Sequence, residues 1–344
     1  MRHKYVDKIV DNFFDFCIND NKDVAMRFYI VLFFLCVSAF IGPVIANKAF
    51  GNAWELSGLS SGLRVDIVTP EAARQSHWKG ERINHIRIPS TVEHLDEFFT
   101  WMGYALLPAD RKVPPIFVKR FPPDYDAIHS AKKRKRLFIK IVLPLILREN
   151  DRLRHVRSQL TDLTQSRDLS AQQRSWLTHL KKRYKLDEDS SISDLLKKVD
   201  VIPPGLALAQ AANESGWGAS RFTMKGNAIY GQWTWSDQDR GIVPLERGEG
   251  ERYKVKAFDN LSLSVRAYML NLNRHNSYAE FRDIRKTLRR SGQDPDSYIL
   301  AQGLTNYSIK REKYVEHIRQ LLSQNNFTRY DDYTLESYIQ LPDT

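Results

Sequence analysis

Cysteine is almost absent from this chain of 344 residues, which contains only Cys17 and Cys36. Two cysteines so close to the N-terminus cannot form a disulfide framework, a cysteine-rich zinc module or an iron–sulfur centre in the rest of the chain. The 9 histidines are dispersed, and neither a His-Glu-x-x-His pair nor a glycine-rich phosphate loop ending in lysine occurs. The sequence therefore predicts no metal site and no cofactor.

Acidic residues are too few to balance the basic ones. The chain has 41 Asp and Glu against 52 Lys and Arg, which leaves a formal charge of +11. Such a chain attracts polyanions, and nucleic acid, anionic lipid and an anionic cell-wall polymer all qualify. A hydrophobic content of 42% and a charged content of 27% are ordinary for globular proteins and argue against a disordered, collagen-like or coiled-coil chain.

One long apolar run covers residues 28–46, which carry no charge. About 18 such residues are enough for a helix to cross the hydrocarbon core of a membrane. We therefore expect a transmembrane helix at 28–46 that anchors the chain, with residues 1–27 in the cytoplasm. The alternative is a signal peptide that is cleaved after Val44-Ile45-Ala46.

The region between this run and residue 200 falls into two parts. Residues 47–130 indicate a tether followed by mixed α/β structure, and residues 131–200 indicate a helical extension. The apolar stretch from Leu137 to Leu147 is too short to span a membrane and is expected to be a buried helix. A short helix is expected to begin at Ser193, whose hydroxyl would cap it.

Glu214 stands at the end of an Ala- and Leu-rich helix that starts near Pro203-Pro204 and is followed by Gly216-Trp217-Gly218. The negative end of the helix dipole and apolar surroundings both disfavour the ionised carboxylate. A carboxyl group of this kind keeps its proton near neutral pH and can donate it to a leaving oxygen. The alternative interpretation is a glutamate that simply points into water.

Four ordered motifs resemble those of the peptidoglycan N-acetylglucosaminidases, the group that includes flagellar muramidase-like and autolysin domains. They are Ala209 to Gly218, Lys225 to Gly231, Tyr253 to Phe258, and Thr305-Asn306-Tyr307 with Lys313-Tyr314. The upstream helical region is similar to the Bax-type bacterial subfamily. The resemblance implies a mainly α (α+β) fold, in which a lysozyme-like helical domain at 201–330 carries a small β-lobe and a tail follows at 331–344.

The resemblance also implies roles for individual residues. Glu214 would be the general acid, and Tyr307 the active-site tyrosine that donates a hydrogen bond near the reacting sugar. A second carboxylate is expected from the β-lobe, where Glu246 fits best and Glu249 and Glu251 are alternatives.

Substrate-binding residues are implied in the same way. They would be Trp217, Asn227, Tyr230 and Trp233, the aromatic ones stacking on sugar rings or, alternatively, packing in the core. Tyr314 is expected to be structural. Ala228 replaces a second asparagine that is usual in the family, so the substrate preference is open.

The predicted function is hydrolysis of the peptidoglycan glycan strand after N-acetylglucosamine, by an endo-β-N-acetylglucosaminidase anchored in the bacterial inner membrane with its catalytic domain in the periplasm. Inverting, retaining and substrate-assisted mechanisms all remain open. One alternative is a lytic transglycosylase, although its Gly-Leu-Met-Gln-like stretch is missing. Another is an inactive, membrane-anchored wall-binding protein. The positive charge would serve binding to peptidoglycan and lipid headgroups, and no nucleic-acid partner is expected.

Overall fold

A computed structural model describes residues 91–248 and 250–337 of the chain. The expected cytoplasmic segment 1–27, the expected membrane helix 28–46 and the expected tether up to residue 90 lie outside these residues. All described residues belong to one compact unit, Arg64–Thr344. In the two described stretches, no helix combines the length and the apolar character that crossing a membrane requires.

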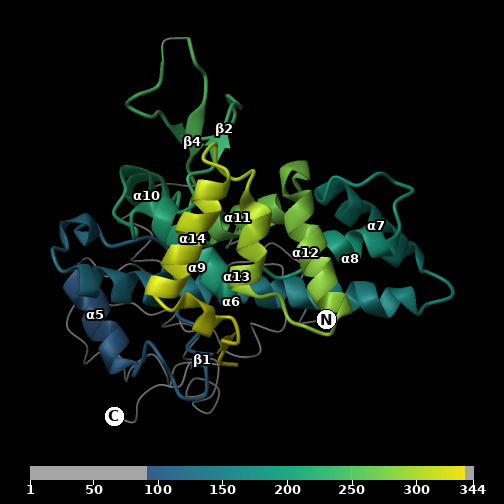
Figure 1. Ribbon diagram of the computed structural model, residues 1–344, viewed down its shortest axis with the longest axis horizontal. Coiled ribbons are helices and arrows are strands. Elements are labelled where there is room, and N and C mark those ends of the chain that lie inside the picture. The colour runs from purple at the N-terminus through teal and green to yellow at the C-terminus, as the bar shows by residue number, and fades with distance from the viewer. Residues whose placement is uncertain (1–90, 249, 338–344) are drawn as a thin grey trace, which may run out of the picture. The chain divides into compact units, whose positions relative to one another are not determined.

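The described chain is mainly helical with two small sheets (Figure 1), which confirms the predicted mainly α class. Its α-helices are α5 (Val92–Trp101), α6 (Ala131–Thr164), α7 (Ala171–Arg183), α8 (Ile192–Lys198), α9 (Pro204–Ser215), α10 (Arg221–Gly226), α11 (Leu261–Arg274), α12 (Ala279–Arg290), α13 (Ser297–Leu300) and α14 (Glu312–Gln324). Short 3-10 helices lie at η2 (Tyr125–Ala127), η3 (Asn276–Tyr278), η4 (Ala301–Leu304) and η5 (Phe327–Tyr330).

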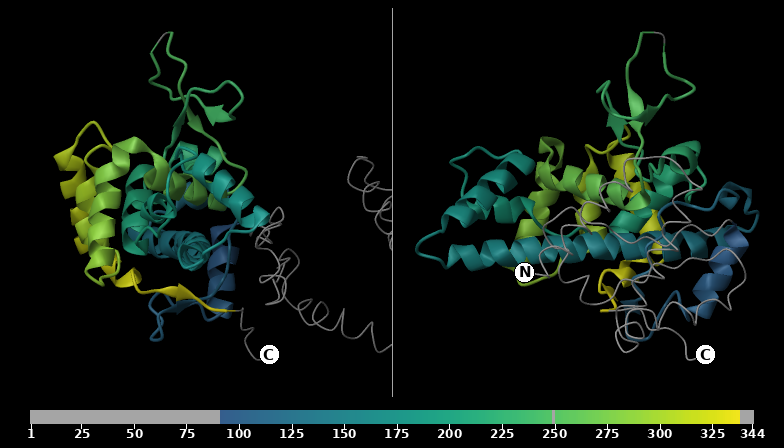
Figure 2. Two further views of the ribbon diagram at one scale, coloured as in Figure 1. Left: turned by 90° about the vertical axis from the view of Figure 1, so that its right-hand side faces the viewer. Right: turned by 180° about the vertical axis from the view of Figure 1, so that it is seen from behind.

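The strands are short and form two separate sheets. In one, β1 (Lys112–Val113) pairs in parallel with β5 (Thr334–Leu335). The other has the antiparallel order β2 (Trp233–Thr234), β4 (Lys254–Lys256) and β3 (Gly241–Ile242). Figures 1 and 2 show this three-stranded sheet projecting from the helical body, beyond one end of α14.

The longest helix, α6, passes through the helical body (Figure 2) and contacts α8, α9 and α11. Ser130 begins it, since its hydroxyl accepts a hydrogen bond from the Lys133 amide. With 34 residues it is about 51 Å long at 1.5 Å per residue. Every residue from Leu137 to Leu147 is buried, which confirms the prediction of a buried helix there.

Helix α9 lies deep in this body and contacts α6, α13, α14 and η5. Pro204 occupies its first turn, and Gly205 packs so tightly that a Cβ atom would lie 2.5 Å from the carbonyl oxygen of Phe327. The helix ends at Ser215 and is capped by Gly216, whose φ of +55° is natural for glycine. Glu214 is therefore carried on the last turn of a buried helix.

Helix α8 begins two residues earlier than predicted, so the expected cap at Ser193 is wrong. The cap is Ser191, whose hydroxyl accepts from the Asp194 amide while the Asp194 carboxylate accepts from the Ser191 amide. This reciprocal pair satisfies two backbone N–H groups at once, which a hydroxyl alone at Ser193 does not do.

Candidate active site

A cleft of about 1300 Å³ lies between the end of α9, the chain around β2, helix α11 and the start of α14. Its lining is mostly aromatic and polar. The lining residues are Asn213, Glu214, Tyr230, Gly231, Gln232, Trp233, Trp235, Asn271, His275, Ser277, Tyr278, Tyr307, Ser308, Ile309, Lys310, Lys313, Tyr314 and His317. The cleft thus gathers segments that are about 100 residues apart in the sequence.

Glu214 is the chemically distinctive group in this cleft. Its Oε1 atom accepts hydrogen bonds from the Tyr314 hydroxyl and the Asn213 side-chain amide, each at 2.9 Å. Burial raises the pKa of this carboxyl above its usual value, against the lowering effect of both hydrogen bonds and of nearby His317. The side chain is thereby suited to hold a proton and release it to a bound oxygen.

A chain of hydrogen bonds runs from the core to Glu214. The buried Tyr268 hydroxyl donates to Gln210 Oε1 at 2.7 Å, and Gln210 Nε2 donates to the Tyr314 hydroxyl oxygen at 2.9 Å. Because Tyr268 holds the amide of Gln210 in one orientation, the Tyr314 oxygen accepts a hydrogen bond from Gln210, and the Tyr314 hydroxyl donates to Glu214. Tyr314 is in this way a positioned donor to the carboxyl group.

The two cleft tyrosines from the C-terminal motif have different environments. Tyr314, expected to be structural, contacts Glu214 directly. Tyr307, expected to be the active-site donor, lines the cleft and stacks on the Tyr314 ring, with ring centres 5.3 Å apart and planes inclined by 13°.

Two of the aromatic residues expected to bind sugar lie in the cleft, in different ways. Tyr230 stacks on Tyr268 with ring centres 3.7 Å apart and donates its hydroxyl to the Ala207 carbonyl oxygen, so that only 2% of it is exposed. Trp233 is 52% exposed and lies beside Trp235, which is 66% exposed. Trp233 therefore offers a ring face to a ligand, whereas Tyr230 is mainly part of the wall.

Trp217 and Asn227 do not line the cleft. The Trp217 ring lies between Phe138 and Phe327, with ring centres 5.6 and 5.8 Å away, and Lys135 lies over it. Asn227 ends α10 with a φ of +52° and donates its side-chain amide to the Phe258 carbonyl oxygen. In the described chain both residues hold secondary-structure elements together.

The candidates for a second carboxylate lie in the loop between β3 and β4. Glu246 and Glu251 are exposed there, and neither lines the cleft. Glu251 accepts a hydrogen bond from the Gly248 amide at 3.0 Å, and Glu249 lies outside the described residues. Among the residues described, Glu214 is thus the only carboxylate in the cleft lining.

Sequence reasoning missed Gln210, Tyr268 and Asn213 as partners of the site. A signal for Gln210 was present, because it is a polar residue in an otherwise Ala- and Leu-rich buried helix, four positions before Glu214. Residues at that spacing share one face of a helix. Tyr268 belongs to the helix that follows the Tyr253–Phe258 motif, but its position in the sequence did not mark it as a partner of the site, which it reaches from α11.

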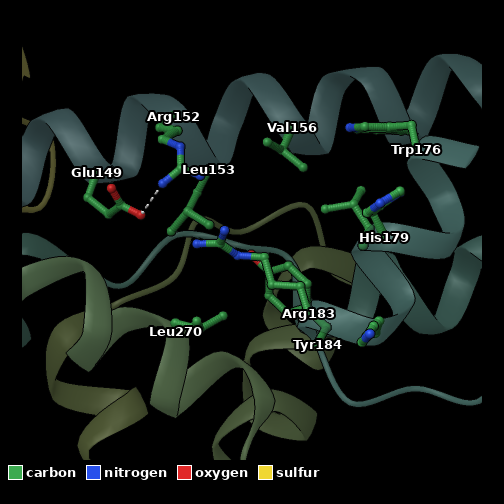
Figure 3. A pocket seen from close by; sticks show the side chains of 11 residues that line it. Glu149, Arg152, Leu153, Val156, Trp176, His179, Arg183, Tyr184 and Leu270 are labelled. Atoms are coloured by element: carbon green, nitrogen blue, oxygen red, sulfur yellow. Dashed lines mark hydrogen bonds and ion pairs between the residues drawn. The ribbon is translucent and has the colours of Figure 1, made fainter. Parts of the chain in front are cut away.

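Another cavity, of about 370 Å³, lies between α6, α7 and α11 (Figure 3). Its walls include Leu153, Leu180 and Leu270, and its carboxylate is Glu149. Arg152 and Arg266 engage the two oxygens of Glu149 at 3.2 and 3.1 Å. No free carboxyl group remains there for proton transfer. In the part of the chain that is described, no three His, Cys, Asp or Glu side chains are arranged to hold a metal ion.

Comparison with known proteins identifies the domain that carries the cleft. Residues 190–327 match the Glucosaminidase family, described as mannosyl-glycoprotein endo-beta-N-acetylglucosaminidase. Protein Bax of Escherichia coli (strain K12) is 29% identical over 208 residues, which cover 59% of this chain and 74% of the E. coli protein. The chain is therefore similar to protein Bax, and its C-terminal part matches the Glucosaminidase family. The resemblance predicted from the four motifs is confirmed, and the glucosaminidase domain includes every residue that lines the cleft.

A solved structure is also similar to part of this chain. It is the catalytic domain of the autolysin Auto from Listeria monocytogenes, with 16% sequence identity and a TM-score of 0.30, covering 51% of this chain and 96% of that domain. A TM-score this low establishes no common fold.

Proposed function

We propose that this protein is a peptidoglycan hydrolase, an endo-β-N-acetylglucosaminidase that cleaves the glycan strand after N-acetylglucosamine, with Glu214 as the general acid and a lysozyme-like arrangement of helices around its cleft. The observation that carries the proposal is the partly buried carboxyl group of Glu214, with its raised pKa, in a cleft of about 1300 Å³ within a region that matches the Glucosaminidase family. Such a cleft has room for several sugar rings.

In the proposed reaction, Glu214 transfers its proton to the glycosidic oxygen as the bond from that oxygen to the anomeric carbon breaks. Positive charge develops at the anomeric carbon, and water completes the hydrolysis. The carboxylate left behind keeps hydrogen bonds from Tyr314 and Asn213. Hydrogen bonds to an ionised acceptor are the strong kind, so these two donors stabilise the carboxylate as it forms.

The second catalytic group is proposed with two alternatives. Glu246 would activate the attacking water, which requires the exposed loop between β3 and β4 to approach the cleft when glycan binds. Alternatively, the N-acetyl group of the substrate would stabilise the anomeric centre. The N-acetyl route is favoured because Glu214 is the only carboxylate in the cleft lining among the described residues.

Single variants of the loop carboxylates distinguish these two routes. A loss of about a thousandfold in kcat for E246Q, E249Q or E251Q would identify that residue as the second carboxylate, since removal of a catalytic group costs a factor of this order. Near-parental rates for all three would leave the N-acetyl route.

The proposed function is tested by mass spectrometry of purified sacculi digested by the protein and by its E214Q variant. We expect products with a reducing N-acetylglucosamine end, and a loss of about a thousandfold in rate for E214Q. Products with a 1,6-anhydro ring would identify a lytic transglycosylase instead. Equal clearing by E214Q and the parent would show that Glu214 is not the acid.

We also propose that residues 28–46 anchor the protein in the bacterial inner membrane, with the glucosaminidase domain in the periplasm. The uncharged run of residues supports this location. The intact mass of the purified protein distinguishes an uncleaved anchor from a chain shortened after Ala46, the alternative in which the protein is secreted to the periplasm.

A further inference from the structure

The chain that leads into α14 contributes two lysines to the cleft lining. Lys310 and Lys313 are exposed, as is Ile309 between Ser308 and Lys310. Among the described residues, neither lysine ammonium group takes part in an ion pair or a side-chain hydrogen bond. These two charges are therefore available to a ligand.

The ionisable groups of the described cleft are unbalanced in charge. Apart from tyrosines, the lining contains Lys310, Lys313, His275 and His317 against one carboxyl group, Glu214. Burial favours the neutral form of that carboxyl, which raises its pKa. The acidic residues next to Lys313 on α14, Glu312 and Glu316, are exposed and are not part of the lining. The cleft consequently has a net positive charge near neutral pH.

The same cleft has an exposed aromatic surface on the projecting sheet. The rings of Trp233 and Trp235 are 6.5 Å apart with their planes inclined by 26°, and Tyr253 lies against Trp233 at 4.3 Å. Ring faces of this kind pack on the apolar faces of sugars. A ligand that satisfies both features is a glycan that carries negatively charged substituents.

We propose that Lys310 and Lys313 bind carboxylate groups on the substituents of the glycan strand, so that the enzyme selects carboxylate-bearing strands over neutral ones. On a sugar that bears a peptide, the lactyl carboxyl is amide-linked and the peptide supplies the carboxylates; on a sugar without a peptide, the lactyl group supplies one itself. This inference rests on the proposed function, since it assigns a substrate preference to the same cleft. The lysines act in binding and take no part in proton transfer.

The test compares soluble peptide-bearing glycan strands with the same strands after carbodiimide and methylamine have converted their carboxylates to neutral amides. We expect the amidated strands to be cleaved with kcat/KM about tenfold lower, mainly through a higher KM, the size expected for loss of exposed charge-assisted contacts. The K310Q/K313Q variant should cleave both forms at nearly the same, lower kcat/KM. Equal cleavage of both forms by the parent, or full discrimination by K310Q/K313Q, would overturn the proposal.

A matched control removes the same amount of charge elsewhere. Lys119 and Lys132 are exposed and do not line the cleft. The K119Q/K132Q variant should therefore discriminate between the two forms as the parent does. Loss of discrimination in this control would mean that the net charge of the protein, and not the two cleft lysines, is responsible.

Binding measurements test this inference separately from the proposed function, and they also identify which carboxylate is bound. The E214Q variant keeps both lysines, and its affinity for the strands is measurable whether or not any strand is cleaved. Tighter binding to peptide-bearing than to amidated strands supports the inference, and equal affinity overturns it. Strands freed of peptide expose the lactyl carboxylate in place of the peptide carboxylates. They should bind E214Q about as tightly as peptide-bearing strands if the lysines bind either carboxylate, and as weakly as amidated strands if only the peptide carboxylates reach the lysines.

Discussion

At the scale of single residues, burial raises the pKa of Glu214, and the hydrogen bonds from Asn213 and Tyr314 lower it. The Tyr314 hydroxyl lies 2.9 Å from the carboxyl oxygen and lowers the pKa of Glu214, while burial raises it more strongly. The adjacent Tyr307 stacks on Tyr314 and lines the same cleft. The two tyrosines can therefore be told apart by their effect on the titration of Glu214.

We predict that Y314F moves the alkaline limb of the pH profile of kcat/KM to higher pH. A general acid must be protonated, so activity falls as the pH rises through the pKa of Glu214, and loss of the Tyr314 donor removes a lowering effect on that pKa. We expect kcat at the optimum to fall about tenfold, the size of one lost hydrogen bond to an ionised group. The Y307F variant should leave the limb where it is. The assignment of Tyr314 is wrong if Y307F moves the limb and Y314F does not.

Part of the site could be predicted from the sequence. Local features such as a helix end can be read from neighbouring residues, whereas contacts between residues far apart in the chain cannot. Glu214 was predictable, since it ends an apolar helix and lies in a recognisable motif. Its contact with Tyr314 joins residues 100 positions apart and depends on how α14 packs on α9. Residue spacing alone could not choose between Tyr307 and Tyr314, which come from one motif.

At the scale of elements, helix α9 positions Glu214 through its tight packing on η5 and α13. A Cβ atom at Gly205 would lie 2.5 Å from the Phe327 carbonyl oxygen and 2.8 Å from Ser297 Oγ. Alanine normally favours a helix over glycine by about 1 kcal/mol. At position 205, the steric clash of a Cβ atom with the Phe327 backbone and the hydrogen-bonded Ser297 side chain outweighs that preference.

We predict that G205A lowers the free energy of unfolding by about 2 kcal/mol or more, since overpacking of a core commonly costs about 1–3 kcal/mol. Urea unfolding of the protein, followed by far-UV circular dichroism, measures the change. G248A serves as the control, because Gly248 is exposed and a Cβ there would meet only the Glu251 side chain, at 3.3 Å or more. A G205A protein as stable as the parent would show that α9 and η5 are less closely packed than the structure has them.

Several helices could be predicted from the sequence, whereas their ends depended on local capping. The apolar run from Leu137 to Leu147 indicated a buried helix, and α6 contains it entirely. The short helix at 192–198 was expected to start at Ser193, but the reciprocal hydrogen bonds of Ser191 and Asp194 start it earlier. Ser191 and Ser193 are both suitable N-cap residues by type, and only the backbone geometry decides which of them caps α8.

At the scale of the whole molecule, the C-terminal segment is part of the structure that holds α9. Asp331 accepts hydrogen bonds from the Gly205 amide at 2.9 Å, from the Ser297 amide at 3.0 Å and from the Ser297 hydroxyl at 2.7 Å. A few residues later, β5 pairs with β1, which lies about 220 positions earlier in the chain. Residues 331–337, expected to be a tail, thus pair with β1 and hold the start of α9 and α13.

We predict that deletion of residues 331–344 destabilises the protein by about 3 kcal/mol or more, since it removes three hydrogen bonds to a carboxylate and the β1–β5 pair. Thermal denaturation checks this expectation. Deletion of residues 338–344 alone, which removes none of these contacts, is the matched control. Similar melting temperatures for the two deletions would contradict the role given to Asp331 and β5.

The sequence by itself determined the composition of the chain, the uncharged run at 28–46, the mainly helical class and Glu214 at the end of an apolar helix. These features depend on residues close together in the chain, where periodicity, capping and charge act directly. Only the tertiary structure decided that Tyr314 bonds to Glu214 and that Trp217 and Asn227 lie outside the cleft. It also decided that Lys310 and Lys313 share one cleft with Trp233 and Trp235. These relations depend on packing between distant segments, because a hydrogen bond or a cleft forms only where such segments come within a few ångströms of each other.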